Sequence, residues 1–252
     1  MLFREISDKE LPDAEKPIII LLHGGGLSSW SLQGVAEQMQ ADYQVIIPLI
    51  DGHGGDGEFI DIRDSADKLI AYIDTNCDGK VFALGGLSIG AQIVTEILSL
   101  RADIAEYAVI ESALVYPIRG LAAAVYGLFY GLSKKRWFSK LQAGALCIPA
   151  EMFKRYYQDS LKISRHSLIN MTASNGSYHL QPSIADTRAR VLIIVGEKEI
   201  GVMHKFARRL HEQINDSVLY IAPAMKHGEL SLRYPDQYVG LLREFFQNDV
   251  IR

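Results

Sequence analysis

The 252-residue chain has little cysteine and no excess of positive charge, and each absence excludes a class of protein. Two cysteines, Cys77 and Cys147, do not make a disulfide framework in a chain of this length. A reducing, cytoplasmic location is therefore expected. The 26 Lys and Arg residues against 30 Asp and Glu residues leave a net charge of −4, which argues against nucleic acid as a partner.

The sequence also lacks the patterns of targeting and membrane-spanning segments. Its N-terminus acquires acidic residues at once, unlike the basic and then apolar order of a signal peptide. The longest nearly uncharged stretch, residues 120–132, is shorter than the roughly 20 residues that cross a bilayer. Stable membrane insertion is therefore not expected.

Motifs for metals and cofactors are absent as well. The chain has no H-E-x-x-H, no C-x-x-C and no phosphate loop, and the glycines at 24–26 lack the spacing of G-x-G-x-x-G. We expect a reaction that needs neither a metal nor a cofactor.

What the sequence does contain is a regular alternation of strand and helix signals. Strands that are apolar throughout and separated by amphipathic helices indicate an α/β fold, with a mostly parallel sheet covered on both faces. Strands are predicted at residues 18–22, 43–47, 81–84, 107–110, 191–195 and 218–221, and helices at about 29–40, 62–73, 91–100, 202–214 and 234–247.

The alternation lapses between residues 112 and 186, where apolar and aromatic residues recur at helical spacing without strand signals. This stretch is too long for a connection, so it predicts a helical cap subdomain within a core formed by residues 1–111 and 187–252. Its apolar residues between 121 and 132 fit a buried helix surface. The alternatives are the lining of an acyl pocket and contact with a membrane or partner through residues 134–137.

The pentapeptide Gly86-Leu87-Ser88-Ile89-Gly90 follows a predicted strand and precedes a predicted helix. A nucleophile elbow requires this order, because the glycines permit close chain approach while the serine is held out above the sheet. The alternative is an ordinary capping serine in a glycine-rich turn.

A serine nucleophile needs a histidine base. Among the seven histidines, His227 follows the last predicted strand, at the sheet edge where sites form. The others fit less well, because they lie in a predicted helix (His204, His211), in the cap (His166, His179) or in glycine turns before the serine (His23, His53).

The base in turn needs a carboxylate that orients it. Glu199 follows the strand at 191–195 and lies between Ser88 and His227 in the chain. We favour it over Glu197, which is closer to the strand end and has less reach, while Glu111, at the end of another strand, is a third candidate. For the developing oxyanion, backbone N–H groups of residues 23–26 and of Ile89 are candidate donors.

Taken together, these pieces resemble the α/β-hydrolase superfamily over nearly the whole chain. The resemblance is carried by HGGG at 23–26, GLSIG at 86–90, VGEKE at 195–199 and KHGE at 226–229. It implies that Gly25 and Ile89 form the oxyanion hole and that residues 112–186 form a cap over the site. The chain departs from the family in the acid, which is most often Asp.

The reading favoured by the sequence is a serine esterase that cleaves a small carboxylic ester or thioester with Ser88, His227 and Glu199. One alternative keeps these residues but transfers the acyl group or hydrolyses a carbon–carbon bond. Another is a non-catalytic binding protein on the same fold. The expected partner is a small acyl substrate, and the oligomeric state is left open.

Overall fold

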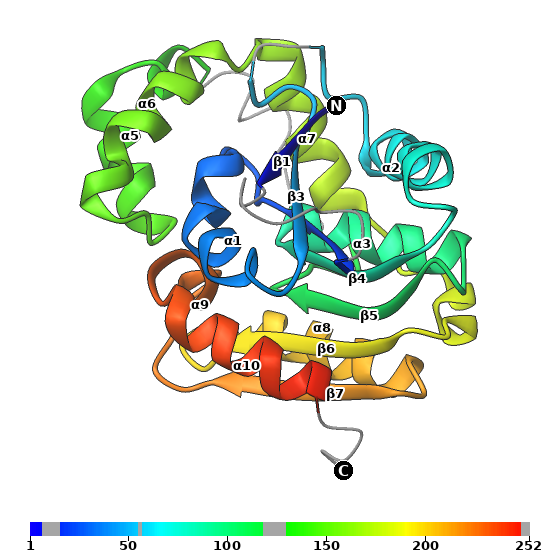
Figure 1. Cartoon of the computed structure of the whole chain (residues 1–252). Helices are drawn as coiled ribbons and strands as arrows, with labels where there is room; N and C mark the ends of the chain where they lie inside the picture. The colour runs from blue at the N-terminus through cyan, green and yellow to red at the C-terminus, as the bar shows by residue number, and fades with distance from the viewer. Residues whose placement is uncertain (7–15, 55–56, 118–129, 248–252) are drawn as a thin grey trace.

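The computed structural model describes residues 1–6, 16–54, 57–117 and 130–247. Its centre is a seven-stranded sheet with helices on both faces (Figure 1). The strand order is β1-β3-β2-β4-β5-β6-β7, and all neighbours are parallel except β1 and β3. The strands are β1 (Leu2–Ile6), β2 (Ile18–Leu22), β3 (Gln44–Leu49), β4 (Val81–Leu87), β5 (Ala105–Glu111), β6 (Arg190–Gly196) and β7 (Ser217–Ala222).

The predicted α/β fold is confirmed, and the six predicted strands are all present. The sequence did not indicate β1. Leu2–Ile6 contains Arg4 and Glu5 and therefore lacks the continuous apolar run that marks the other strands. As an edge strand it pairs only with β3, and this antiparallel pairing completes the sheet.

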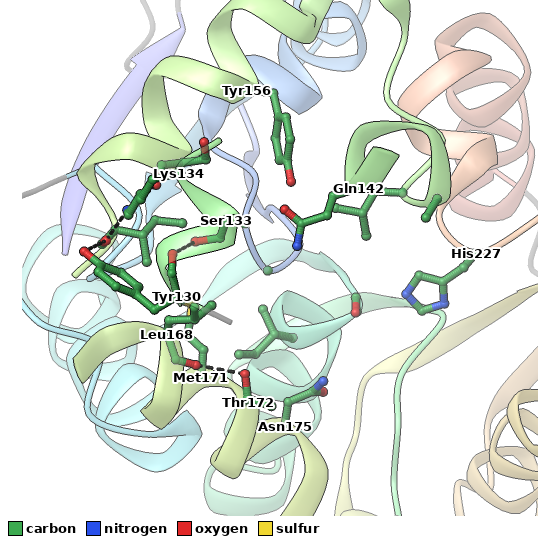
Figure 2. Close-up of a pocket in the computed structure, with 18 of the residues that line it drawn as sticks. Tyr130, Ser133, Lys134, Gln142, Tyr156, Leu168, Met171, Thr172, Asn175 and His227 are labelled. Atoms are coloured by element: carbon green, nitrogen blue, oxygen red, sulfur yellow. Dashed lines mark hydrogen bonds between the residues drawn. The ribbon is translucent and has the colours of Figure 1, made fainter. Parts of the chain in front are cut away.

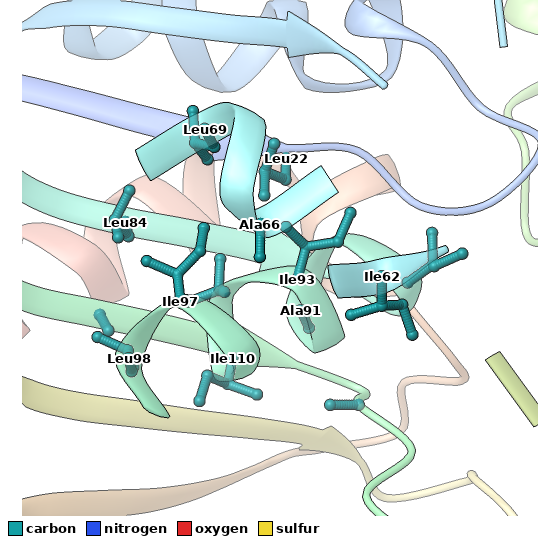
Figure 3. Close-up of a cluster of buried hydrophobic side chains, with 14 of the residues drawn as sticks. Leu22, Ile62, Ala66, Leu69, Leu84, Ala91, Ile93, Ile97, Leu98 and Ile110 are labelled. Atoms are coloured by element: carbon teal, nitrogen blue, oxygen red, sulfur yellow. The ribbon is translucent and has the colours of Figure 1, made fainter. Parts of the chain in front are cut away.

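Each face of the sheet packs against its own helices. One face is covered by α2 (Ile62–Asn76), α3 (Ile89–Leu100) and α8 (Gly201–Gln213), and Figure 3 shows apolar side chains of α2 and α3 packed on this face. The other face is covered by α1 (Gln33–Met39) and α10 (Pro235–Gln247). Because the central strands are buried on both faces, their sequences read as apolar runs.

The helix predicted at 29–40 is divided in the structure, since a 3₁₀ turn, η2 (Ser29–Leu32), precedes α1. A short helix, α9 (Glu229–Arg233), lies between β7 and α10. None of the helices in the described part of the chain is long and apolar enough to cross a membrane.

A helical insertion separates β5 from β6, as the sequence predicted. Its described elements are α5 (Arg136–Ala145), η3 (Ala150–Met152), α6 (Phe153–Lys162), α7 (Arg165–Ser177) and η4 (Pro182–Asp186). In Figure 1, α5 and α6 project beyond the sheet. Most of the apolar stretch at 121–132 lies outside the described residues, whereas Tyr130 and Leu132 are described and half-buried.

Candidate active site

Ser88 occupies a sharp turn between β4 and α3. Its φ of 54° and ψ of −114° place a non-glycine residue in the left-handed half of conformational space, a strain that costs on the order of 1–3 kcal/mol. The flanking glycines make the turn possible. A Cβ on Gly86 would lie 2.4 Å from the Gly90 carbonyl carbon, and one on Gly90 would lie 2.6 Å from the His23 carbonyl oxygen.

His227 and Glu199 are joined by a hydrogen bond. The distance from His227 Nδ1 to Glu199 Oε2 is 2.7 Å. The carboxylate is itself held in place, because its Oε1 accepts hydrogen bonds from Ser112 Oγ at 2.6 Å and from the Gly196 amide at 2.9 Å. With Nδ1 engaged by the carboxylate, Nε2 is the nitrogen of His227 left to exchange a proton.

The surroundings of Glu199 favour its charged form. Its side chain is 1% exposed, and burial alone would raise the pKa of this carboxyl group. The hydrogen bond and charge of His227, together with the donors from Ser112 and Gly196, outweigh burial and hold the pKa of Glu199 below its usual range.

The other two carboxylates weighed from the sequence have different partners. Glu197 Oε2 accepts a hydrogen bond from the Ala224 amide at 2.7 Å. Glu111 is buried and lies 3.5 Å from the Ser231 amide, and burial raises the pKa of Glu111 to about 7. Of the three, Glu199 is the one that contacts His227 in the structure.

The glycine loop after β2 lies against the nucleophile turn. A Cβ on Gly25 would come within 3.6 Å of the Ile89 side chain, and Gly25, Ile89, Ser88 and His227 line one cavity. The loop is anchored by His23, whose Nε2 accepts a hydrogen bond from the Ile50 amide at 3.2 Å. Burial, with a smaller contribution from His53, lowers the pKa of His23 to about 3, so this imidazole is neutral.

The cavity has a volume of about 430 Å³ and is roofed by the insertion. Figure 2 shows Gln142 of α5, Tyr156 of α6 and Met171 of α7 around the same space as His227. Its walls combine apolar residues with several polar ones. The polar side chains from the insertion are Tyr130, Ser133, Lys134, Gln142, Tyr156, Ser160, Thr172 and Asn175.

Lys134 lines this cavity, but its ammonium group is engaged in hydrogen bonds within the insertion. Its Nζ donates to the main-chain oxygens of Ser160 at 2.5 Å, Ile163 at 2.6 Å and Leu161 at 3.1 Å. These three bonds use all the ammonium protons and hold the C-terminal end of α6. Lys134 therefore has no proton left to offer an anionic ligand without breaking this anchor.

Sequence reasoning missed Ser112 and the polar cavity residues of the insertion. Ser112 directly follows β5 and adopts a φ of 57°, but no local motif marks it as a partner of a glutamate 87 positions later. Gln142 lies on the amphipathic helix α5, where a polar residue is ordinarily taken as solvent-facing, and Asn175 lies on α7, whose sequence has no apolar face that would mark which side is buried. The described residues contain no group of three His, Cys, Asp or Glu side chains that could hold a metal ion.

Comparison with known proteins identifies the family. A model of the alpha/beta hydrolase family matches residues 19–241. The chain belongs to this family. Among curated proteins, this α/β hydrolase is similar to the pimeloyl-[acyl-carrier protein] methyl ester esterase of Neisseria meningitidis serogroup C, with 26% identity over 97% of the chain and 98% of the relative.

Solved structures share the fold of this α/β hydrolase at low sequence identity. An esterase from Exiguobacterium antarcticum superposes with a TM-score of 0.80 at 17% identity, covering 98% of this chain and 95% of the other. A thermophilic esterase from Thermogutta terrifontis gives 0.78 at 15% identity, covering 97% and 92%. These likenesses establish the fold.

Proposed function

We propose that this α/β hydrolase is a serine esterase that cleaves a small carboxylic ester or thioester through Ser88, His227 and Glu199. The 2.7 Å hydrogen bond between His227 and Glu199 carries the proposal, because it orients the imidazole at a cavity that Ser88 also lines. The buried, ionised Glu199 is suited to stabilise the imidazolium that forms when His227 takes a proton.

In the proposed reaction, Ser88 Oγ attacks the carbonyl carbon of the substrate while His227 Nε2 accepts the hydroxyl proton. The N–H groups of Gly25 and Ile89 stabilise the oxyanion. His227 then protonates the leaving alcohol or thiol, which breaks its bond to the acyl carbon and leaves an acyl-enzyme. Water, deprotonated by His227, attacks the acyl-enzyme, and the released Ser88 takes the proton back.

A fluorophosphonate probe tests this proposal directly, because it reacts with activated serines. We expect covalent labelling of Ser88, found by mass spectrometry of the digested protein, and loss of labelling in His227→Gln. Folded protein that hydrolyses no p-nitrophenyl ester and is not labelled at Ser88 would refute the proposal. Ser99→Ala is a matched control, since Ser99 lies at the far end of the same helix and bonds to Thr95.

The relative in Neisseria meningitidis suggests a finer candidate, an ester presented on an acyl-carrier protein. Charge favours it. Residues 112–186 contain nine Lys and Arg against three Asp and Glu, a net charge of +6, which would attract an acidic carrier to the mouth of the cavity. Lys135, Arg136 and Lys140 are exposed members of this group.

A salt titration distinguishes a carrier-bound ester from a free one. We expect kcat/KM for an ester on an acidic carrier to fall by about tenfold or more between 50 and 300 mM salt, because salt screens the charges that steer the carrier to the enzyme. Lys135→Glu with Arg136→Glu should reproduce that loss at low salt. Neither the added salt nor the two substitutions should change kcat/KM for an uncharged p-nitrophenyl ester. Equal effects on both substrates would contradict the proposal that a carrier presents the ester.

A further inference from the structure

Glu111 is a buried carboxyl group beside the proposed triad that the reaction above does not use. It ends β5, and its main-chain oxygen accepts a hydrogen bond from the Ser88 amide at 2.8 Å. Its side chain is directed to the other half of the site, where Oε1 lies 3.5 Å from the amide of Ser231, four residues after His227. One residue thus adjoins both the nucleophile turn and the segment that carries the base.

The carboxyl oxygens of Glu111 have few hydrogen-bond partners for a buried side chain. Glu111 is 2% exposed, and its Oε2 has no hydrogen-bond partner among the described residues. The bond to Ser231 is long, so it compensates little of the free energy lost when a carboxyl group leaves water. A costly polar group at this position calls for a role that an apolar side chain could not fill.

The groups that surround Glu111 show what its charge can act on. Burial raises the pKa of Glu111 to about 7, Ser231 and His227 oppose this rise, and Glu199 adds to it. Tyr238 of α10 also interacts with Glu111, and burial raises the pKa of Tyr238 well above its usual range, so its hydroxyl stays neutral. Among these neighbours, His227 is the basic side chain.

We infer that Glu111 is a positioning residue for His227, a second carboxylate whose negative charge stabilises the imidazolium formed during ester cleavage. This inference rests on the proposed function. The proton of Ser88 still passes to His227 and then to the leaving group, and Glu111 neither gives nor takes a proton in the cycle. Glu199 holds the ring through its hydrogen bond, while Glu111 acts through space from the end of β5, next to Ser231 of α9.

Proton NMR of the imidazoles tests the inference without turnover. The His227 signal, assigned by its loss in His227→Gln, is titrated in the wild type, in Glu111→Gln and in Glu96→Gln. Glu96 is the matched control, because it is also buried and its pKa is also raised by burial, but its partners are Tyr178 and Arg63.

In Glu111→Gln we expect the His227 midpoint to fall by about half a pH unit or more, because a nearby negative charge is lost. The kcat/KM for a p-nitrophenyl ester at pH 8 should fall about 3- to 10-fold, the equivalent of half to one pH unit. KM should change little, and Glu111→Asp should restore the midpoint. An unchanged His227 midpoint in folded Glu111→Gln would overturn the inference.

A measurement on the wild type covers the case in which Glu111→Gln does not fold. With carbon-13 in the glutamate carboxyl groups, one carboxyl signal should titrate near pH 7, and the His227 signal should show a second inflection at the same pH. If one glutamate carboxyl stays protonated through pH 8, or if a carboxyl titrates in this range without an inflection in the His227 signal, the inference fails. Labelling of Ser88 by the fluorophosphonate is measured separately, so failure of the proposed function can be told apart from failure of the inference about Glu111.

Discussion

The sheet core and the inserted helices differ in charge and in what they contribute to the site. The insertion has a net charge of +6, whereas the rest of the chain has 17 Lys and Arg against 27 Asp and Glu, a net charge of −10. The turns and loops that follow strands of the core hold Ser88, Glu199 and His227, and the insertion supplies most of the cavity wall. The proposed reacting groups and most of the cavity wall thus come from different parts of the chain.

The two regions also differ in packing. Core strands β2 and β4 approach α3 so closely that glycine is required at 86 and 90. In the insertion, a Cβ on Gly176 would have nothing within 4 Å, and Trp137 and Leu141 are 63% and 70% exposed. We therefore expect core substitutions near the site to be costly and those in the insertion to redirect specificity at low cost.

The largest effect is expected for Ser88→Ala. Removal of the nucleophile should lower kcat by about 10⁴-fold or more, as in other enzymes that rely on a serine triad. Steady-state hydrolysis of a short p-nitrophenyl ester measures this, and circular dichroism checks that the fold is kept. If Ser88→Ala retained even a tenth of wild-type activity, the chemistry would have to be placed elsewhere.

We also expect acid to lower the stability of the fold, through two histidines that are buried in the core. Burial lowers the pKa of His53 to about 4 and that of His23 to about 3, so both are neutral in the fold. Their contribution to stability is complete above about pH 6.5, the unfolded value, and is lost as pH falls toward 4 and 3, by about 1.4 kcal/mol per pH unit for each histidine.

Thermal unfolding between pH 7 and 4 measures this loss. In His53→Gln, the melting temperature should depend less steeply on pH than in the wild type. The exposed His179 of the insertion serves as the control, and His179→Gln should leave the slope unchanged. Equal slopes in all three proteins would show that the buried imidazoles do not govern acid stability.

Gly86→Ala should destabilise the core by about 3 kcal/mol or more, because the new Cβ would lie 2.4 Å from main-chain atoms of Gly90 that cannot move without disrupting the elbow. Gly176→Ala, in α7 of the insertion, should range from neutral to a gain of about 1 kcal/mol from helix propensity. Urea unfolding compares the two variants, and similar losses in both would erase the contrast between the regions.

The smallest effect is expected from Met171→Trp, which reduces the cavity on the insertion side. Hydrolysis of p-nitrophenyl octanoate should fall about tenfold or more relative to the acetate, because a long acyl chain loses room whereas a short one does not. A panel of chain lengths measures the ratio. An equal loss on both esters would mean that Met171 acts on the chemistry and not on specificity.

Much of the fold could be predicted from local patterns. Apolar runs marked β2 to β6 because these strands are buried on both faces, and a run at 218–221 also marked the edge strand β7, which is only half-buried. Gly86 and Gly90 marked the elbow because its geometry excludes side chains. The edge strand β1 was not predicted, since Leu2–Ile6 contains Arg4 and Glu5 and has no continuous apolar run. The walls of the cavity escaped it too, because they come from separate helices of the insertion.

The sequence by itself determined the alternation of strands and helices, the turn at Ser88 and the loop that carries His227, because each depends on neighbouring residues. Only the tertiary structure decided which carboxylate meets the imidazole. The order β5-β6-β7 brings Ser112, Glu199 and His227 together from positions far apart in the chain. The same order brings the buried Glu111 next to Ser231, four residues after His227, because neighbouring strand ends share one edge of the sheet.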